Sequence, residues 1–165
     1  MNKKGQLELS FGMIFSIIII IATIAVAVYF IFQFLSTSKC TNIVMTKSDL
    51  QSQIDNVWKS SQAQQIYTLS FPTNIKSICF GNLSSGGSAY SNEYIDLRRY
   101  SLGDSNLFLF PSTEACDGKS AQTHLNHIVN TAFFCVPLKE GKGKIMLLKE
   151  SSQLLVKITS LNSTW

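Results

Sequence analysis

The chain has 165 residues and a formal net charge of +4, with 45% hydrophobic and 15% charged residues. This length suits one domain of ordinary size. From Cys40 onward there are eleven basic and nine acidic residues. So weak an excess, without a basic stripe interleaved with aromatic residues, argues against nucleic acid as a partner.

The first strong pattern along the chain is an uncharged apolar run. No charged side chain occurs between Ser10 and Ser38, and Phe11 to Leu35 is rich in isoleucine. A bilayer core needs about 20 apolar residues in a helix, and in lipid even isoleucine-rich sequence is helical because every backbone group must bond internally. We therefore predict a transmembrane helix over residues 10–36, with the lipid bilayer around it.

The flanking residues predict the orientation of this helix. Lys3 and Lys4 adjoin its N-terminal end, and the positive-inside bias places such residues in the cytoplasm. Residues 1–9 are then a cytoplasmic basic stub or leader, and the rest of the chain faces outward. The alternative is a cleaved secretory signal, because Ala25-Val26-Ala27 has the small-x-small form of a cleavage site. The apolar run continues past Ala27 to Leu35, which favours a retained anchor.

The cysteines agree with an outward location. Cys40, Cys79, Cys116 and Cys135 all follow the apolar run, and none forms a Cys-x-x-Cys pair. An even set in a small extracytoplasmic domain predicts disulfides rather than a zinc site. Four cysteines allow three pairings. We favour Cys40 with Cys79 and Cys116 with Cys135, because each pair closes a modest loop; four reduced thiols are the alternative.

An amphipathic helix is predicted over residues 40–62. Its apolar face is formed by residues at spacings of three and four, namely Leu50, Ile54, Val57, Trp58 and Ser61. Thr46 with Asp49 three residues on could be a capping box that starts a separate helix. Alternatively, the helix is continuous with the apolar run.

Residues 63–165 are predicted to form a β-rich extracytoplasmic head, which makes the fold class α+β: a long N-terminal helix packed on a small antiparallel sheet. Seven short segments rich in branched and aromatic residues are predicted strands: 66–71, 75–80, 94–100, 107–110, 132–137, 144–150 and 153–159. The last three read as an antiparallel meander. Residues 81–92 and 118–130 read as polar loops.

The opening stretch resembles that of archaeal type IV pilins and pseudopilins. The residues that carry the resemblance are Lys3, Lys4, Gly5 and Gln6, followed by the apolar segment. The resemblance covers about 35 residues closely and the rest in outline. It implies cleavage between Gly5 and Gln6 by a prepilin-type peptidase, and assembly with like subunits through the transmembrane helix.

Glu8 is the candidate assembly residue under this resemblance. In the archaeal pattern a serine stands third and a glutamate fifth after cleavage, whereas here Glu8 is third and Ser10 fifth. In such families the glutamate is thought to meet a neighbouring subunit's N-terminal amine. The alternative is an interfacial charge in the first turn of a helix, where the helix dipole favours an anion.

No catalytic constellation is visible, so we predict neither an enzyme nor a cofactor. His124 and His127 are three residues apart, as metal ligands on a helix can be, but no second pair accompanies them. The acidic residues are scattered among turns, and no two are placed for acid–base chemistry.

Two glycosylation sequons begin at Asn82 and Asn162, in a predicted loop and in the C-terminal tail. Both positions suit an outward surface. We therefore expect a single-pass, outward-facing membrane protein of the cell surface, a structural or surface-display protein that resembles a pilin or pseudopilin subunit. The alternative is a monomeric membrane-anchored binding module that forms no filament.

Overall fold

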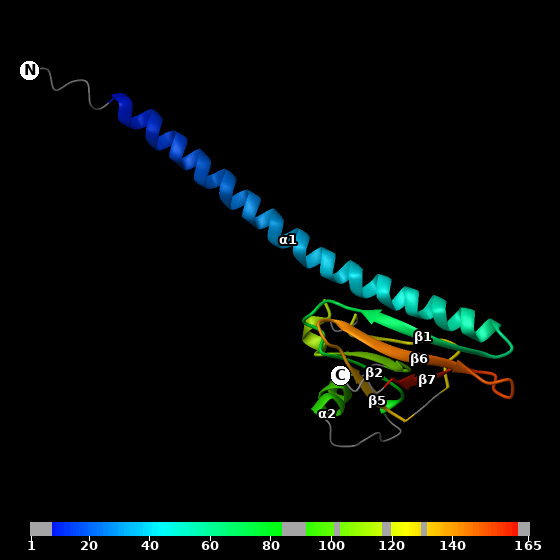
Figure 1. Cartoon of the computed structure of the whole chain (residues 1–165). Helices are drawn as coiled ribbons and strands as arrows, with labels where there is room; N and C mark the ends of the chain where they lie inside the picture. Colours follow the sequence, from blue (N-terminus) through cyan, green and yellow to red (C-terminus); the bar gives the residue numbers. More distant parts are fainter. Residues whose placement is uncertain (1–7, 84–91, 101–102, 117–119, 130–131, 162–165) are drawn as a thin grey trace, which may run out of the picture. The chain divides into compact units, whose positions relative to one another are not determined.

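The computed structural model describes residues 8–83, 92–100, 103–116, 120–129 and 132–161 (Figure 1). The chain divides into two compact units between Ser38 and Lys39. Predictions for residues 1–7, 84–91 and 162–165 lie outside the described residues. The fold class is α+β, as predicted from the sequence.

The first unit contains the apolar part of helix α1, which runs without interruption from Glu8 to Lys59. Every side chain from Gly12 to Leu35 is exposed. The hydroxyls of Ser16, Thr23 and Thr37 donate to helix carbonyls three or four residues earlier, so these polar side chains are satisfied within the helix. The continuous helix rules out a separate helix beginning at Thr46.

Thr46 instead joins the helix to the first strand. Its hydroxyl donates a hydrogen bond to the carbonyl of Ser70 at 2.7 Å. The hydroxyl is therefore a tertiary contact rather than a helix cap.

The second unit holds the rest of α1 and the α+β head. Its remaining elements are β1 (Ala63–Ser70), β2 (Ser77–Phe80), α2 (Asn92–Tyr100), β3 (Leu107–Phe110), the 3-10 helix η2 (Ser112–Glu114), β4 (Gln122–Thr123), β5 (Phe134–Pro137), β6 (Lys142–Lys149) and β7 (Lys157–Ser160). The strands form two antiparallel sheets, one in the order β1-β6-β7 and the other in the order β4-β3-β2-β5. Figure 1 shows β1 and β6 lying side by side.

The predicted meander of the last three strands is wrong at its first member. β6 pairs with β7 as expected, but β5 pairs with β2 in the other sheet. This pairing places Phe134 opposite Phe80 and covers β2 on both edges. Since all four residues of β2 are buried, the strand belongs in the interior of a sheet. β5 therefore pairs with the distant strand β2 rather than with its neighbour in sequence, β6.

The main core lies between α1 and the two sheets. The buried face of the helix consists of Ile43, Leu50, Ile54 and Val57, each at most 2% exposed. These residues pack in one cluster with side chains of both sheets, including Leu69, Ile78, Leu109 and Ile145. The predicted helix face is thus confirmed at Leu50, Ile54 and Val57. It is extended by Ile43, while Trp58 is half-buried and Ser61 is exposed beyond the helix end.

Residues 94–100 form helix α2, not the predicted strand. Tyr94 and Leu97 are three residues apart and both are buried, which is helical spacing. They cover a second core cluster on Cys79, Phe108 and Phe133. The aromatic and branched residues that suggested a strand therefore serve as one face of a helix.

Both disulfides differ from the pairing favoured on loop length. Cys40 is bonded to Cys116 and Cys79 to Cys135. Cys79 and Cys135 are register partners across β2 and β5, with Cα atoms 4.0 Å apart. The pairing of β2 with β5 therefore brings the sulfurs of Cys79 and Cys135 together. The length of the loop that a disulfide closes does not determine this pairing.

Candidate functional sites: an apolar helix segment and a polar groove

The first candidate site is the apolar segment of α1. By length and composition this helix can cross a membrane, and none of its most apolar stretch is buried. Small residues, which allow helices in a membrane to approach closely, are exposed along this segment at Gly12, Ser16, Ala22, Ala25 and Ala27. The apolar segment therefore has no partner within the described part of the chain.

The sequence-predicted processing and modification sites fall mostly outside the described residues. Gly5 and Gln6 precede α1, and Asn162 follows the last described residue. Glu8 is the first residue of α1. Asn82 is half-buried and forms an isolated bridge with Ala132. Cleavage, assembly through Glu8 and glycosylation all remain predictions.

The second candidate site is a polar seam in the head, where one stripe of α1 meets the segment 120–127. Lys47, Gln51 and Asp55 follow one another at intervals of four residues, so they line the same side of the helix. The ammonium group of Lys47 donates to the carbonyl of Ser120 and lies 3.4 Å from that of Gln122. The neighbouring carbonyls of Ala121 and Thr123 instead accept the backbone N–H groups of Leu109 and Asn106, so Lys47 binds the alternate carbonyls of this segment.

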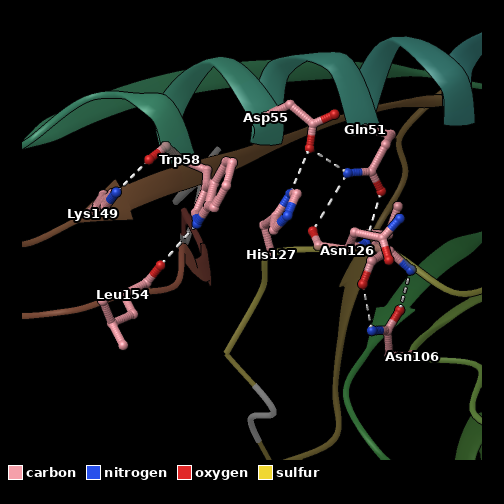
Figure 2. A network of polar contacts seen from close by, with 9 residues as sticks. Gln51, Asp55, Trp58, Asn106, Asn126, His127, Lys149 and Leu154 are labelled. Atoms are coloured by element: carbon pink, nitrogen blue, oxygen red, sulfur yellow. Dashed lines mark hydrogen bonds and ion pairs between the residues drawn. The ribbon is translucent and has the colours of Figure 1, made fainter.

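Gln51 continues the seam with its side-chain amide. The Gln51 oxygen accepts the backbone N–H of Asn126 at 2.9 Å, and the Gln51 nitrogen donates to the Asp55 carboxylate at 2.7 Å. Figure 2 shows these contacts between the helix and the segment below it. On the far side of the segment, the Asn106 amide bonds both the N–H and the C=O of Leu125, at 2.6 and 2.9 Å. The segment is therefore held by amides on two sides.

Asp55 contacts His127 at the end of this seam. The Nδ1 atom of His127 lies 3.0 Å from the carboxylate of Asp55, and both side chains are about one-third exposed. Hydrogen bonds from His127 and then from Gln51 lower the pKa of the Asp55 carboxyl below its ordinary value. Asp55 is therefore held in its ionised form as an acceptor for both neighbours.

Trp58 closes the seam at the C-terminal turn of α1. Its indole ring stacks on the His127 ring with centroids 3.8 Å apart and planes at 8°, and its Nε1–H donates to the carbonyl of Leu154 at 2.9 Å (Figure 2). The Lys149 ammonium binds the Trp58 carbonyl and lies 5.9 Å from the indole centroid. A cation on a carbonyl of the last turn offsets the negative end of the helix dipole.

A groove of about 670 Å³ lies along this seam. Hydroxyl, amide and charged side chains dominate its lining, which comes from Val44, Lys47, Ser48, Gln51, Ser52, Asp55, Asn56 and Lys59 of α1 and from Ser120 and residues 122–126. Such a lining can hydrogen-bond a polar ligand. Among the described residues no three His, Cys, Asp or Glu side chains gather as a metal site.

The two histidines are separated by their contacts. His124 lies at the groove, where its Nδ1 is 2.6 Å from the carbonyl of Asp104, while His127 binds Asp55 and stacks on Trp58. They therefore do not act as a pair toward a common ligand.

Neither the groove nor the seam is predicted by the sequence. The four-residue spacing of Lys47, Gln51 and Asp55 was visible, but it could not identify Ser120, Asn126 and His127 as their partners. These contacts join residues more than 70 positions apart.

Comparisons of the chain with protein-family models, curated proteins and solved structures gave no match.

Proposed function

We propose that this protein is a single-pass, membrane-anchored structural subunit that displays its head outside the cell, in the manner of a pilin or pseudopilin. The observation that carries the proposal is the dual use of α1. Residues Gly12–Leu35 are mostly apolar and are exposed, while Ile43, Leu50, Ile54 and Val57 of the same helix are buried in the head. A helix exposing that much apolar surface needs lipid or the same segment of other copies around it.

The two disulfides support an outward head. Both lie in the second unit, and disulfides persist mainly in oxidising compartments. Lys3 and Lys4 before the apolar segment favour a cytoplasmic N-terminus. Leu154 is 86% exposed and offers a label site for a direct test.

The orientation is tested with Leu154→Cys and a membrane-impermeant maleimide. We expect labelling in intact cells to equal that after permeabilisation, with wild-type protein as the unlabelled control. Labelling only after permeabilisation would reverse the proposed orientation. Release of the protein by alkaline carbonate would contradict membrane anchoring.

The pilin-like assignment is tested at the N-terminus, by intact-mass and N-terminal peptide analysis of protein from native membranes. A mature chain that begins at Gln6 is the expected result. Gly5→Arg should block this cleavage, whereas Gly12→Ala, a glycine change inside the helix, should leave it unchanged. A chain that retains Met1 to Gly5 contradicts processing by a prepilin-type peptidase.

The second candidate function is a monomeric anchored binding module, which the groove beside α1 favours. Its lining of hydroxyls and amides offers many donors and acceptors to a polar ligand. This alternative predicts a retained N-terminus and a monomer in native membranes. Chemical cross-linking in those membranes separates the two functions, because a structural subunit should yield a ladder of multimers.

A further inference from the structure

Strand β1 has an open outer edge. It is the first strand in the order β1-β6-β7, so among the described residues β6 is its one strand partner. The N–H of Phe71 donates to the carbonyl of Gly141, in the register that pairs Ser70 with Lys142. In an antiparallel ladder bonding alternates. The odd-numbered residues of β1 therefore bond to β6, and Gln64, Ile66 and Thr68 direct their N–H and C=O groups outward.

The contact from Thr46 agrees with this alternation. Its hydroxyl reaches the carbonyl of Ser70, another even-numbered residue, from the side away from β6. That bond covers one end of the edge. Gln64, Ile66 and Thr68 are all exposed.

The residues of β1 lack the features that usually prevent edge pairing. The strand reads AQQIYTLS, with no charged residue and no proline over eight positions. Natural edge strands are commonly short, or carry lysine or proline. Here the centre of the edge is Ile66, with 59% of its surface exposed. Such an edge is suited to adding another strand.

The other sheet edges in the described part of the chain are protected. β4 is two residues long, and the Lys47 ammonium binds the carbonyls of Gln122 within it and of Ser120 just before it. β5 is four residues long and ends in Pro137. β7 begins with Lys157, and the residue before it bonds to the segment 127–129. The contrast singles out β1.

We propose that the edge Gln64–Thr68 is a docking surface for the same edge of a second copy of this chain. The two strands pair antiparallel about a two-fold axis at Ile66, which joins two three-stranded sheets into one. This inference goes beyond the proposed function, since it depends on neither cleavage nor a membrane.

The edge is complementary to itself in this register. Ile66 meets Ile66 of the second copy, and Gln64 meets Thr68, so an apolar pair is flanked by two uncharged polar pairs. Lys144 lies next to Thr68 on β6, and Lys157 lies two strands from Gln64. Between the two paired strands themselves no like charges stand opposite each other, an arrangement that would disfavour the pairing. A charged partner strand would gain nothing from the uncharged edge itself.

The register is tested by disulfide cross-linking of the full-length chain in detergent. Directly opposed residues that exchange both hydrogen bonds have Cα atoms about 5.5 Å apart, which a disulfide can span. All four native cysteines are already in disulfides, so Ile66→Cys adds the one free thiol. We expect this variant to cross-link into a dimer on mild oxidation.

Thr68→Cys is the matched control on the same strand. Two Thr68 residues would be four positions apart, roughly 13 Å at ~3.3 Å per residue, so this variant alone should not cross-link. A mixture of Thr68→Cys chains with Gln64→Cys chains should cross-link, because those positions face each other. Equal cross-linking of Ile66→Cys and Thr68→Cys would overturn the proposal.

Disruption of the edge gives an independent test by sedimentation in density-matched detergent. Ile66→Lys and Thr68→Lys should each raise the dissociation constant of the dimer at least tenfold. Ile95→Lys, at an exposed apolar residue on α2, should leave it unchanged. A dimer that survives both edge variants, with native circular dichroism, places the association elsewhere. Processing at Gly5 is read out separately, so either idea can fail alone.

Discussion

The disulfide map leads to a prediction about single and double cysteine variants. The bonds Cys40–Cys116 and Cys79–Cys135 close separations of 76 and 56 residues. In the chain-entropy model, loops of this size stabilise by about 4 kcal/mol each. Cys40→Ser and Cys116→Ser should therefore each lower the free energy of unfolding by about 4 kcal/mol. The double variant should lose no more, because the same bond is removed once.

Cys79→Ser should cost more than either of those variants. Cys79 is fully buried in the cluster with Phe108 and Phe133. A hydroxyl placed there without a partner adds about 1–3 kcal/mol to the lost loop closure. The total is comparable with the whole stability of many domains, about 5–15 kcal/mol. We therefore expect Cys79→Ser to be poorly folded and Cys40→Ser to retain a weakened fold.

The assay is urea unfolding of the full-length chain in detergent, followed by tryptophan fluorescence, with non-reducing peptide mapping of the same samples. The ring of Trp58 reports on the head because it stacks on His127. Additive losses for Cys40→Ser and Cys116→Ser, summing to about 8 kcal/mol in the double variant, would refute their pairing. A mapped peptide that links Cys40 to Cys79 would do the same.

Three further changes probe the head. Gly141→Ala places a Cβ 2.1 Å from a backbone oxygen at a φ of 76°, and should lower the free energy of unfolding by more than about 3 kcal/mol. Gly103→Ala, also at positive φ but with nothing within 4 Å of the new Cβ, should cost about 1 kcal/mol; urea unfolding measures both. Because the pKa of Asp55 is lowered in the folded state, its contribution is present above the unfolded pKa and is lost as pH falls through the folded one. On acidification, Asp55→Asn should therefore lose less unfolding free energy than the wild type. The difference should be under about 1 kcal/mol because the Asp55–His127 pair is partly exposed, and urea titrations at several pH values measure it. An unchanged acid slope would contradict that contact. Lys47→Met leaves two carbonyls without their donor and should cost about 1–2 kcal/mol, measured as a lower urea midpoint; a change below about 0.3 kcal/mol would mean that water replaces the ammonium.

Several features of this protein were determined locally and could be predicted from the sequence. The uncharged run from Ser10 to Ser38 by itself predicts an apolar helix. The three-and-four spacing of Leu50, Ile54 and Val57 by itself predicts the buried face of the helix that follows. Strands at 107–110 and 144–150 were recognised from their branched and aromatic residues. In each case the pattern and the burial depend on the same few neighbouring residues.

Helix α2 marks the limit of such local reasoning. Tyr94, Ile95, Leu97 and Tyr100 fit a strand by residue type and a helix by spacing. The segment is a helix because Tyr94 and Leu97 are then buried together against the cluster that contains Cys79 and Phe108.

Only the tertiary structure decided the pairings that bring distant residues together. β5 pairs with β2 rather than β6, and this register places Cys135 opposite Cys79. The partners of Lys47 and Asp55 lie more than 70 residues away, on a segment whose own sequence shows no strong pattern. The sequence by itself thus determined where the apolar helix lies and that an α+β head follows it. Strand partners, disulfides and the groove depended on which buried surfaces fit together, because a contact between distant segments leaves no periodic trace in either one.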